Sequence, residues 1–146
     1  MNDCLFCKII KGEIPSYKIY EDEHTYAFLD ISNDFLGHTL IIPKVHADNI
    51  FDINKESLYH LTNTTKLLCE HYKSLGFTGI NIQNNSGETA GQTVFHIHVH
   101  VIPRGIAKDT LKILKLNSST DDLKRVSEVF FIKKWQPPVD KPRIIC

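Results

Sequence analysis

Residues 94–103 read Val94-Phe95-His96-Ile97-His98-Val99-His100-Val101-Ile102-Pro103, so three histidines alternate with aliphatic residues. Successive side chains of a β-strand point to opposite faces of its sheet. A strand over residues 94–102 therefore places the three histidines on one face and the aliphatic residues on the other, toward the core. Three buried imidazoles would need three sets of polar partners. The pattern indicates a functional site, either a metal site or a nucleophile flanked by orienting imidazoles.

A polar loop precedes this strand and favours phosphate as the ligand. Residues 84–93 offer amide and hydroxyl groups, and two glycines, Gly87 and Gly91, let backbone N–H groups approach a ligand. Such a nest of N–H groups suits phosphate oxygens, although the same composition also occurs in ordinary loops. Its direct connection to the histidine strand strengthens the phosphate interpretation.

Hydrophobic periodicity predicts the elements around this strand. We expect a short helix over residues 4–11, strands over 17–21, 25–30, 39–44 and 78–83, and a long helix over about 55–75. Asn54 is the expected N-cap of the long helix and Gly76 its C-cap. Five strands around one long helix predict an α+β fold with an antiparallel sheet.

The segment after Pro103 is predicted to be helical. Thr120 can cap a second helical piece, with Asp121 and Asp122 at its start and Lys133 and Lys134 at its end, before Pro137-Pro138 stops it. Residues 1–103 carry 7 basic and 12 acidic side chains, whereas residues 104–146 carry 10 and 5. We expect this basic tail to be an appendage to the core, either a solvated helix face or a contact for anionic groups.

Composition excludes several classes of function. The 146 residues suit one domain, and 17 basic against 17 acidic residues argue against binding a nucleic acid polymer through a basic surface. No apolar stretch approaches the roughly 20 residues that cross a membrane, and the first residues lack the features of a signal peptide. We therefore expect a cytoplasmic, reducing environment, in which the cysteines are thiols or metal ligands.

The chain resembles the histidine triad (HIT) family over residues 4–104. The family signature matches Gly91-Gln92-Thr93-Val94-Phe95-His96-Ile97-His98-Val99-His100-Val101-Ile102. Further matches are Cys4-Leu5-Phe6-Cys7-Lys8-Ile9-Ile10, Phe28-Leu29-Asp30-Ile31 and Gly37-His38-Thr39-Leu40-Ile41-Ile42-Pro43-Lys44-Val45-His46. The prokaryotic-type Hint branch is the most similar. The resemblance implies a HIT-like fold over residues 1–104, a C-terminal helical extension over 105–146, and a homodimer that pairs the long helix and a sheet edge of each subunit.

The resemblance also implies an activity and the residues that carry it. The expected enzyme is a HIT family hydrolase or transferase that cleaves the α-phosphate bond of purine nucleoside phosphoramidates or related nucleotidyl conjugates through a covalent nucleotidyl-histidine. The implied catalytic residues are His98 as nucleophile, His100, Thr93 and His38. A free imidazole with a pKa near ~6.5 is largely neutral in the cell and can attack without a strong base. The implied nucleotide-binding residues are Leu5, Phe6, Ile9, Phe28, Asp30, Ile31, Asn85, Gln92, Thr93, His98 and His100, with Asp30 on the ribose hydroxyls.

Cys4 and Cys7 have the spacing of metal ligands but supply only two of the usual four. In the family's zinc-binding subset, the residues that match His46 and His96 complete the site. The resemblance therefore implies a structural Cys₂His₂ zinc site that pins the N-terminal helix to the sheet and takes no part in the chemistry. The alternative is a pair of ordinary reduced thiols.

Three other functions remain open at this point. The histidines His96, His98 and His100 could hold a catalytic zinc with a bound water. A nucleotide-binding adaptor would need no turnover. A Fhit-like hydrolase of dinucleoside polyphosphates is the third, since Ala90-Gly91-Gln92-Thr93-Val94 is closer to that branch. Trp135, in a stretch similar to the Trp-Pro-Pro ending of some Hint proteins, is expected to pack at an interface or core edge.

Overall fold

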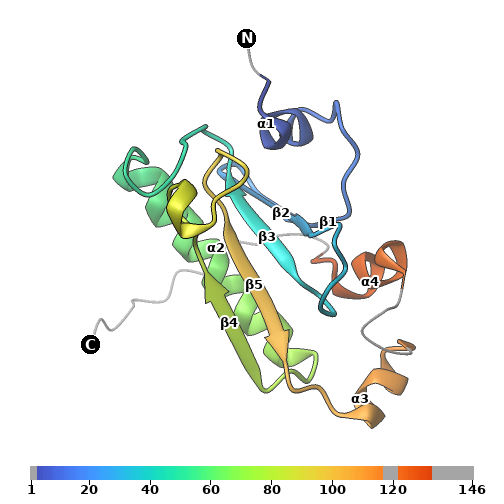
Figure 1. Cartoon of the computed structure of the whole chain (residues 1–146). Coiled ribbons are helices and arrows are strands. Elements are labelled where there is room, and N and C mark those ends of the chain that lie inside the picture. The colour runs from blue at the N-terminus through green and yellow to red at the C-terminus, as the bar shows by residue number, and fades with distance from the viewer. Residues whose placement is uncertain (1–2, 117–121, 133–146) are drawn as a thin grey trace.

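Five antiparallel strands form one sheet in the computed structural model, which describes residues 3–116 and 122–132 (Figure 1). The strands are β1 (Lys18–Glu21), β2 (Thr25–Leu29), β3 (Thr39–Pro43), β4 (Gly79–Gln83) and β5 (Val99–Arg104), in the spatial order β1-β2-β3-β5-β4. The first four lie within one residue of their predicted bounds. The predicted α+β class with a five-stranded antiparallel sheet is confirmed. Because β5 lies between β3 and β4, the histidine segment runs into the middle of the sheet.

Both faces of the sheet are covered, so β2 and β3 are buried at every position. On one face, α2 (Lys55–Ser74) packs its buried side into the main core. On the other face, the short helix α1 (Leu5–Ile10) closes a second cluster made of Phe6, Ile9, Tyr26, Phe28, Leu40 and Ile42. The prediction of one long and one short helix is therefore confirmed, and the space beside α1 is where the site lies.

The long helix begins at the predicted N-cap, but its C-cap is Leu75 and not the predicted Gly76, which is the next residue. The Asn54 side chain accepts a hydrogen bond from the backbone N–H of Ser57 at 2.7 Å, which satisfies a donor that the first helical turn leaves open. Gly76 follows the helix with a φ of 113°, a conformation that side chains rarely adopt. A Cβ on Gly76 would also come within 2.6 Å of Thr110. Glycine is therefore required where the chain turns from α2 into β4.

The predicted strand over residues 94–102 is wrong in its first half, because β5 begins only at Val99. The preceding residues bond to the segment after β3 instead of to a strand. The backbone N–H of Ile97 donates to the carbonyl oxygen of Ala47 at 2.8 Å, and His96 Nε2 contacts the carbonyl oxygen of Pro43 at 2.8 Å. The alternation still holds, since Ile97 lies in the main core while His96 and His98 contact Phe6 on the opposite side.

The expectation that the C-terminal tail is an appendage is also wrong. The chain continues from β5 into α3 (Lys108–Ile113) and α4 (Leu123–Phe130), and α4 packs beside β1 and β2 (Figure 1). Phe130 is fully buried against Tyr72 and Phe77 in the main core. Its ring lies so close to Gly37 that a Cβ there would come within 2.3 Å. The core therefore includes this helix.

The start and end of α4 differ from the prediction. Its N-cap is Asp122, whose side chain accepts from the backbone N–H of Lys124 at 2.9 Å. The helix stops at Phe130, and the backbone N–H of Ile132 donates to Ile19 of β1 at 2.9 Å. The expectations for Thr120, Asp121, Lys133, Lys134, Trp135, Pro137 and Pro138 fall outside the described residues. Within residues 3–116 and 122–132, no helix has the length and apolar character that crossing a bilayer needs.

Replacing Phe130 with alanine should lower the free energy of unfolding by about 3–5 kcal/mol, because it empties a filled part of the core. Urea denaturation monitored by circular dichroism measures this loss. Phe131→Ala is the matched control, since Phe131 is the next residue and is 39% exposed. If both variants lose the same small amount, α4 does not belong to the core.

Candidate functional site

A cavity of about 420 Å³ opens beside α1 and contains most of the predicted site residues. Its apolar end is lined by α1, the residues after it and the outer side chains of β2 and β3. Its polar end is lined by the loop before the histidines and by the histidines themselves. The predicted residues that line it are Leu5, Phe6, Ile9, Phe28, Asp30, Ile31, Asn85, Thr93, His98 and His100. We call it the histidine cavity.

Gly91, one of the two glycines expected to approach a ligand, also lines the cavity. Four further lining residues were not predicted: Ile14, Pro15, Leu40 and Val94. Their types are those of ordinary core and loop residues, so no signal in one sequence separates them from packing. Together with the predicted apolar residues they give the cavity one end suited to a flat hydrophobic group and another suited to a polar one.

The ring of His98 is held in one orientation and one tautomer. Its Nδ1 lies 2.8 Å from the carbonyl oxygen of His96, and a carbonyl can only accept, so Nδ1 carries the proton. Nε2 therefore keeps its lone pair. The edge of the ring meets Phe6 with ring centroids 5.2 Å apart, and Asn84 Nδ2 donates to the His98 carbonyl oxygen at 2.9 Å. Burial lowers the pKa of His98, which favours the neutral, nucleophilic ring.

His100 and His38 form a hydrogen-bonded pair next to His98. His100 Nδ1 lies 2.9 Å from His38 Nε2, and His38 Nδ1 lies 2.7 Å from Asp34 Oδ1. Burial and the neighbouring histidines lower the pKa of His100 to about 4, so this ring is neutral at neutral pH. His38 is buried behind His100 and does not line the cavity. Asp34 was missed in the sequence, although its spacing of four residues from His38 was a possible signal.

Gln92, implied by the resemblance as a nucleotide-binding residue, does not line the histidine cavity. Its side chain is 4% exposed. Its Nε2 donates to the carbonyl oxygens of Asp48 and Val94 at 2.6 and 3.0 Å, and its Oε1 accepts from the Gly87 N–H and the Asn49 side chain at 2.8 and 3.3 Å. Through these four hydrogen bonds, the Gln92 side chain connects the polar loop to the segment after β3. Thr93, by contrast, is exposed at the cavity.

The four residues of the predicted metal site lie together. The ligand atoms of Cys4, Cys7, His46 and His96 are all within 4.8 Å of one another. His96 Nδ1 lies 3.4 Å from Cys4 Sγ, 3.5 Å from Cys7 Sγ and 3.1 Å from His46 Nδ1. A zinc tetrahedron with bonds of about 2.0–2.3 Å has edges of about 3.3–3.8 Å. The four atoms are therefore close to the arrangement that zinc requires.

The tautomers of the two histidines support a cation between them. His96 Nε2 faces the Pro43 carbonyl oxygen at 2.8 Å, and His46 Nε2 faces the Asp48 carboxylate at 3.0 Å. Both Nε2 atoms therefore carry the proton, and two Nδ1 lone pairs face each other at 3.1 Å. Lone pairs repel unless a cation lies between them. Metal-binding histidines commonly donate their second nitrogen to such a carbonyl or carboxylate.

A second cluster, Asp30, His38 and His100, also has ligand atoms within 4.8 Å. Here His38 Nδ1 faces Asp34, and a single proton between His38 Nε2 and His100 Nδ1 makes their contact at 2.9 Å an ordinary hydrogen bond. Among the described residues, His96 groups with the cysteines and not with His98 and His100. This arrangement disfavours a catalytic zinc held by the three histidines.

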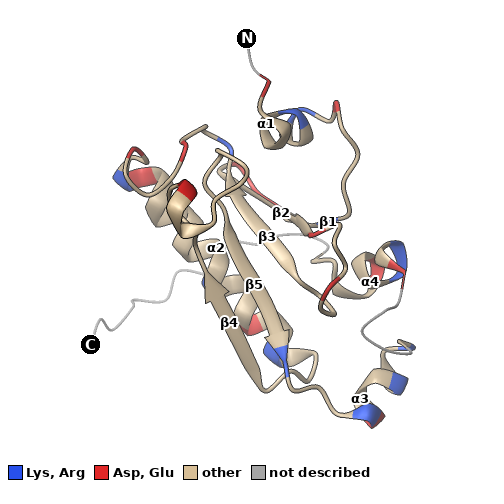
Figure 2. Ribbon diagram, viewed as in Figure 1, with Lys and Arg blue, Asp and Glu red and all other residues tan. Residues whose placement is uncertain are grey.

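The basic residues that the structure describes on α3 and α4 do not line the histidine cavity. Figure 2 shows Lys and Arg on α3 and α4, and α3 follows the end of β5 away from His98. The residues that line the cavity include no lysine or arginine. Among the described residues, a phosphate bound in the cavity would therefore meet hydroxyl and imidazole groups and no lysine or arginine.

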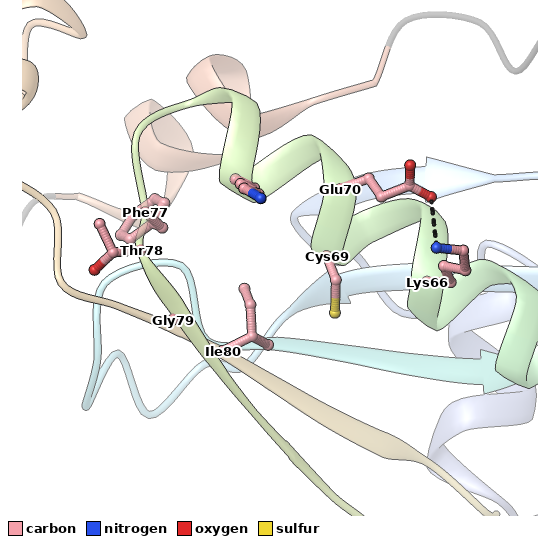
Figure 3. A pocket seen from close by; sticks show the side chains of 8 residues that line it. Lys66, Cys69, Glu70, Phe77, Thr78, Gly79 and Ile80 are labelled. Carbon is pink, nitrogen blue, oxygen red and sulfur yellow. Dashed lines mark ion pairs between the residues drawn. The ribbon is translucent and has the colours of Figure 1, made fainter.

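A separate hollow of about 270 Å³ lies between α2 and β4 (Figure 3). It is lined by Ile80 of the strand and by four residues of the helix, Lys66, Cys69, Glu70 and Lys73. Burial raises the pKa of the Cys69 thiol, so it is not a reactive thiolate. This hollow has no arrangement of catalytic groups, and it borders β4, which within the described residues pairs with β5 alone.

The comparisons with known proteins agree with the geometry. The HIT domain model matches residues 11–106. The chain is 46% identical over 106 residues to Protein hit of Bacillus subtilis, covering 70% of this chain and 71% of that protein. It is 44% identical over 108 residues to adenosine 5'-monophosphoramidase HNT1 of Saccharomyces cerevisiae, covering 74% and 66%. It is 39% identical over 104 residues to adenylylsulfatase HINT3 of Arabidopsis thaliana, covering 70% and 53%.

The crystal structure of a Zn-bound histidine triad family protein from Mycobacterium smegmatis is also similar. It has a TM-score of 0.75 and 35% identity, and the match covers 88% of this chain and 90% of that one. The match of the HIT domain model and the identity to these relatives define the class of protein. The chain belongs to the HIT domain family and is a hydrolase of that family.

Proposed function

We propose that the protein hydrolyses purine nucleoside phosphoramidates or related nucleotidyl conjugates at the α-phosphate, with His98 as the nucleophile. The observation that carries this proposal is the bond between His98 Nδ1 and the His96 carbonyl oxygen, which leaves a lone pair on Nε2 of a ring that lines the cavity. The names of the yeast and Arabidopsis relatives, a monophosphoramidase and an adenylylsulfatase, support attack at the same atom, the α-phosphorus, with different leaving groups.

The reaction takes two displacements at phosphorus. In the first, the Nε2 lone pair of His98 forms a bond to the α-phosphorus, the bond from phosphorus to the leaving nitrogen breaks, and that nitrogen gains a proton as the amine departs. In the second, a water oxygen bonds to phosphorus, the bond to Nε2 breaks and its electron pair returns to the ring, while the water loses a proton. Covalent catalysis divides one difficult step into two easier ones.

The cavity orients the nucleotide for this attack. The apolar end beside α1 holds the purine, and Asp30, at the end of β2, accepts hydrogen bonds from the ribose hydroxyls. Asn85 lies near the sugar and phosphate, and Thr93 donates to the phosphate or the leaving group. His100 contacts a phosphate oxygen or the leaving atom. Gln92 contributes indirectly, by holding the loop that carries Thr93.

Zinc is proposed as a structural ion held by Cys4, Cys7, His46 and His96. When bound, it supplies a crosslink between α1 and the segments around the sheet and no step of the reaction. Because Phe6 of α1 also packs on His98, this crosslink would fix one wall of the cavity.

We also propose a homodimer through α2 and the free edge of β4. In the described residues β4 pairs on one side only, and Ile82 on this strand is 59% exposed. The hollow in Figure 3 lies on the same surface. A second copy would cover an edge that otherwise invites unwanted strand pairing. The molecular mass in solution tests this, and a monomer at micromolar concentration would contradict it.

Two alternative functions are tested by one substrate panel. Adenosine and guanosine phosphoramidates are compared with adenosine 5'-phosphosulfate and dinucleoside polyphosphates by kcat/KM. The proposal predicts that a phosphoramidate has the highest value. Preference for a dinucleotide would move the protein to the Fhit-like function. Nucleotide binding without cleavage of any member would leave the adaptor function.

A further inference from the structure

Asp34, His38 and His100 form a row of hydrogen bonds that ends in the histidine cavity. Asp34 Oδ1 lies 2.7 Å from His38 Nδ1, and His38 Nε2 lies 2.9 Å from His100 Nδ1. Asp34 is outside the cavity lining and its side chain is 43% exposed, whereas His100 lines the cavity. The row therefore connects a carboxylate near the surface to a ring that can reach substrate.

The row has two proton arrangements, because the Asp34 carboxylate accepts the Nδ1 proton of His38 in both. If His38 is neutral, its Nε2 accepts from His100 Nδ1, and His100 Nε2 carries a lone pair. If His38 is protonated, its Nε2 donates to His100 Nδ1, and His100 Nε2 carries a proton toward the cavity. The protonation of His38 thus decides whether His100 donates or accepts at the substrate.

The carboxylates around the row lie close to the His38 ring. His38 lies between two carboxylates, with Asp34 at 2.7 Å and an Asp30 oxygen at 3.8 Å from its nearer nitrogens. Burial alone would raise the pKa of Asp34, but its bond to His38 lowers it, so Asp34 stays ionised. His100, with its pKa of about 4, does not hold the charge itself. A neutral His100 can still donate the proton on its Nε2 if a proton from His38 moves to its Nδ1.

We propose that Asp34 is a positioning residue that keeps His100 as the proton donor to the leaving atom. This inference rests on the proposed function. As the bond from phosphorus to nitrogen breaks, the proton on His100 Nε2 moves to the departing amine, and the proton on His38 Nε2 moves to His100 Nδ1. His38 becomes neutral, and the bare Nε2 of His100 then accepts the proton that water loses in the second displacement. The row returns to its starting state after each turnover.

The test compares leaving groups that differ in their need for a proton. An alkylamine must gain a proton to leave, whereas sulfate leaves as an anion. We expect Asp34→Asn to lower kcat/KM for an adenosine alkyl phosphoramidate by about 10–100-fold. For adenosine 5'-phosphosulfate, the change should stay within about threefold, because kcat/KM covers only the first displacement. The asparagine keeps a hydrogen-bond acceptor and removes the charge.

Glu56→Gln is the matched control, because Glu56 also lies four residues before a histidine, His60, but on the exposed face of α2. It should change neither value. An equal loss on both substrates would mean that Asp34 serves the structure alone, and no loss on the phosphoramidate would remove it from the mechanism. If the wild-type protein cleaves the phosphoramidate, the proposed function holds, and either of these results overturns only the role of Asp34. If the wild-type protein cleaves neither substrate, both the proposed function and the role of Asp34 are overturned.

Discussion

Replacing His98 with alanine should lower kcat for an adenosine phosphoramidate by at least about 10⁴-fold, since it removes the atom that bonds to phosphorus. Binding of adenosine monophosphate should change much less, because Asp30 and the apolar end of the cavity remain. Stopped assays at high enzyme concentration measure the residual rate, and calorimetry measures the dissociation constant. The two measurements separate chemistry from binding.

His60→Ala is the control for this variant, since His60 is a partly buried histidine on α2 that lies outside the histidine cavity. Because the His98 ring packs against Phe6, the circular dichroism spectrum and the melting temperature show whether the variant folds. A folded His98→Ala protein that keeps more than a tenth of the wild-type kcat would refute the nucleophile assignment.

Loss of the metal should have the second large effect, on stability. We expect the purified protein to contain one zinc per chain. Cys7→Ala should lose the metal and lower the free energy of unfolding by about 4 kcal/mol, the value for a ligand present at 1,000 times its dissociation constant. Elemental analysis measures the zinc content, and denaturant unfolding measures the stability. The part of the protein that stays folded should retain activity, because the zinc is proposed as a structural ion only.

Cys69→Ala provides the comparison for this experiment. Cys69 is a half-buried thiol on α2, outside the Cys/His cluster, and its replacement should leave the zinc content unchanged. If the wild-type protein carries no zinc and a chelator does not change its melting temperature, the cluster is a set of ordinary thiols and imidazoles. If chelation abolishes activity while the fold is intact, the metal has a direct catalytic role.

Much of the architecture could be predicted because its signals are local. Asn54 caps α2, Gly76 ends its turn, and the apolar periodicity places the first four strands within one residue. The histidine pattern also predicted that His98 and His100 lie on one face, and both line the histidine cavity. Local patterns succeed here because the same residues determine both the backbone conformation and the direction of the side chains.

The errors concern contacts between residues far apart in the sequence. The histidine segment has strand-like alternation, yet His96 bonds to Pro43 and only the later residues find strand partners. Nothing local indicates that Phe130 fills the space above Gly37. Gln92 has an amide side chain that could bind phosphate. In the folded chain, however, this amide makes its four hydrogen bonds within the protein, among them those to Asp48 and Gly87. Such pairings become visible only when the chain is folded.

The most direct measurement for the central claim is the mass of the protein during turnover. The enzyme is mixed with excess adenosine phosphoramidate, quenched within milliseconds under alkaline denaturing conditions that preserve phosphorus–nitrogen bonds, and analysed by intact mass and peptide fragmentation. The account predicts an added adenylyl group on His98 of the wild-type protein and none on His98→Ala. Rapid turnover with no adduct at any time, or an adduct on another residue, would contradict it.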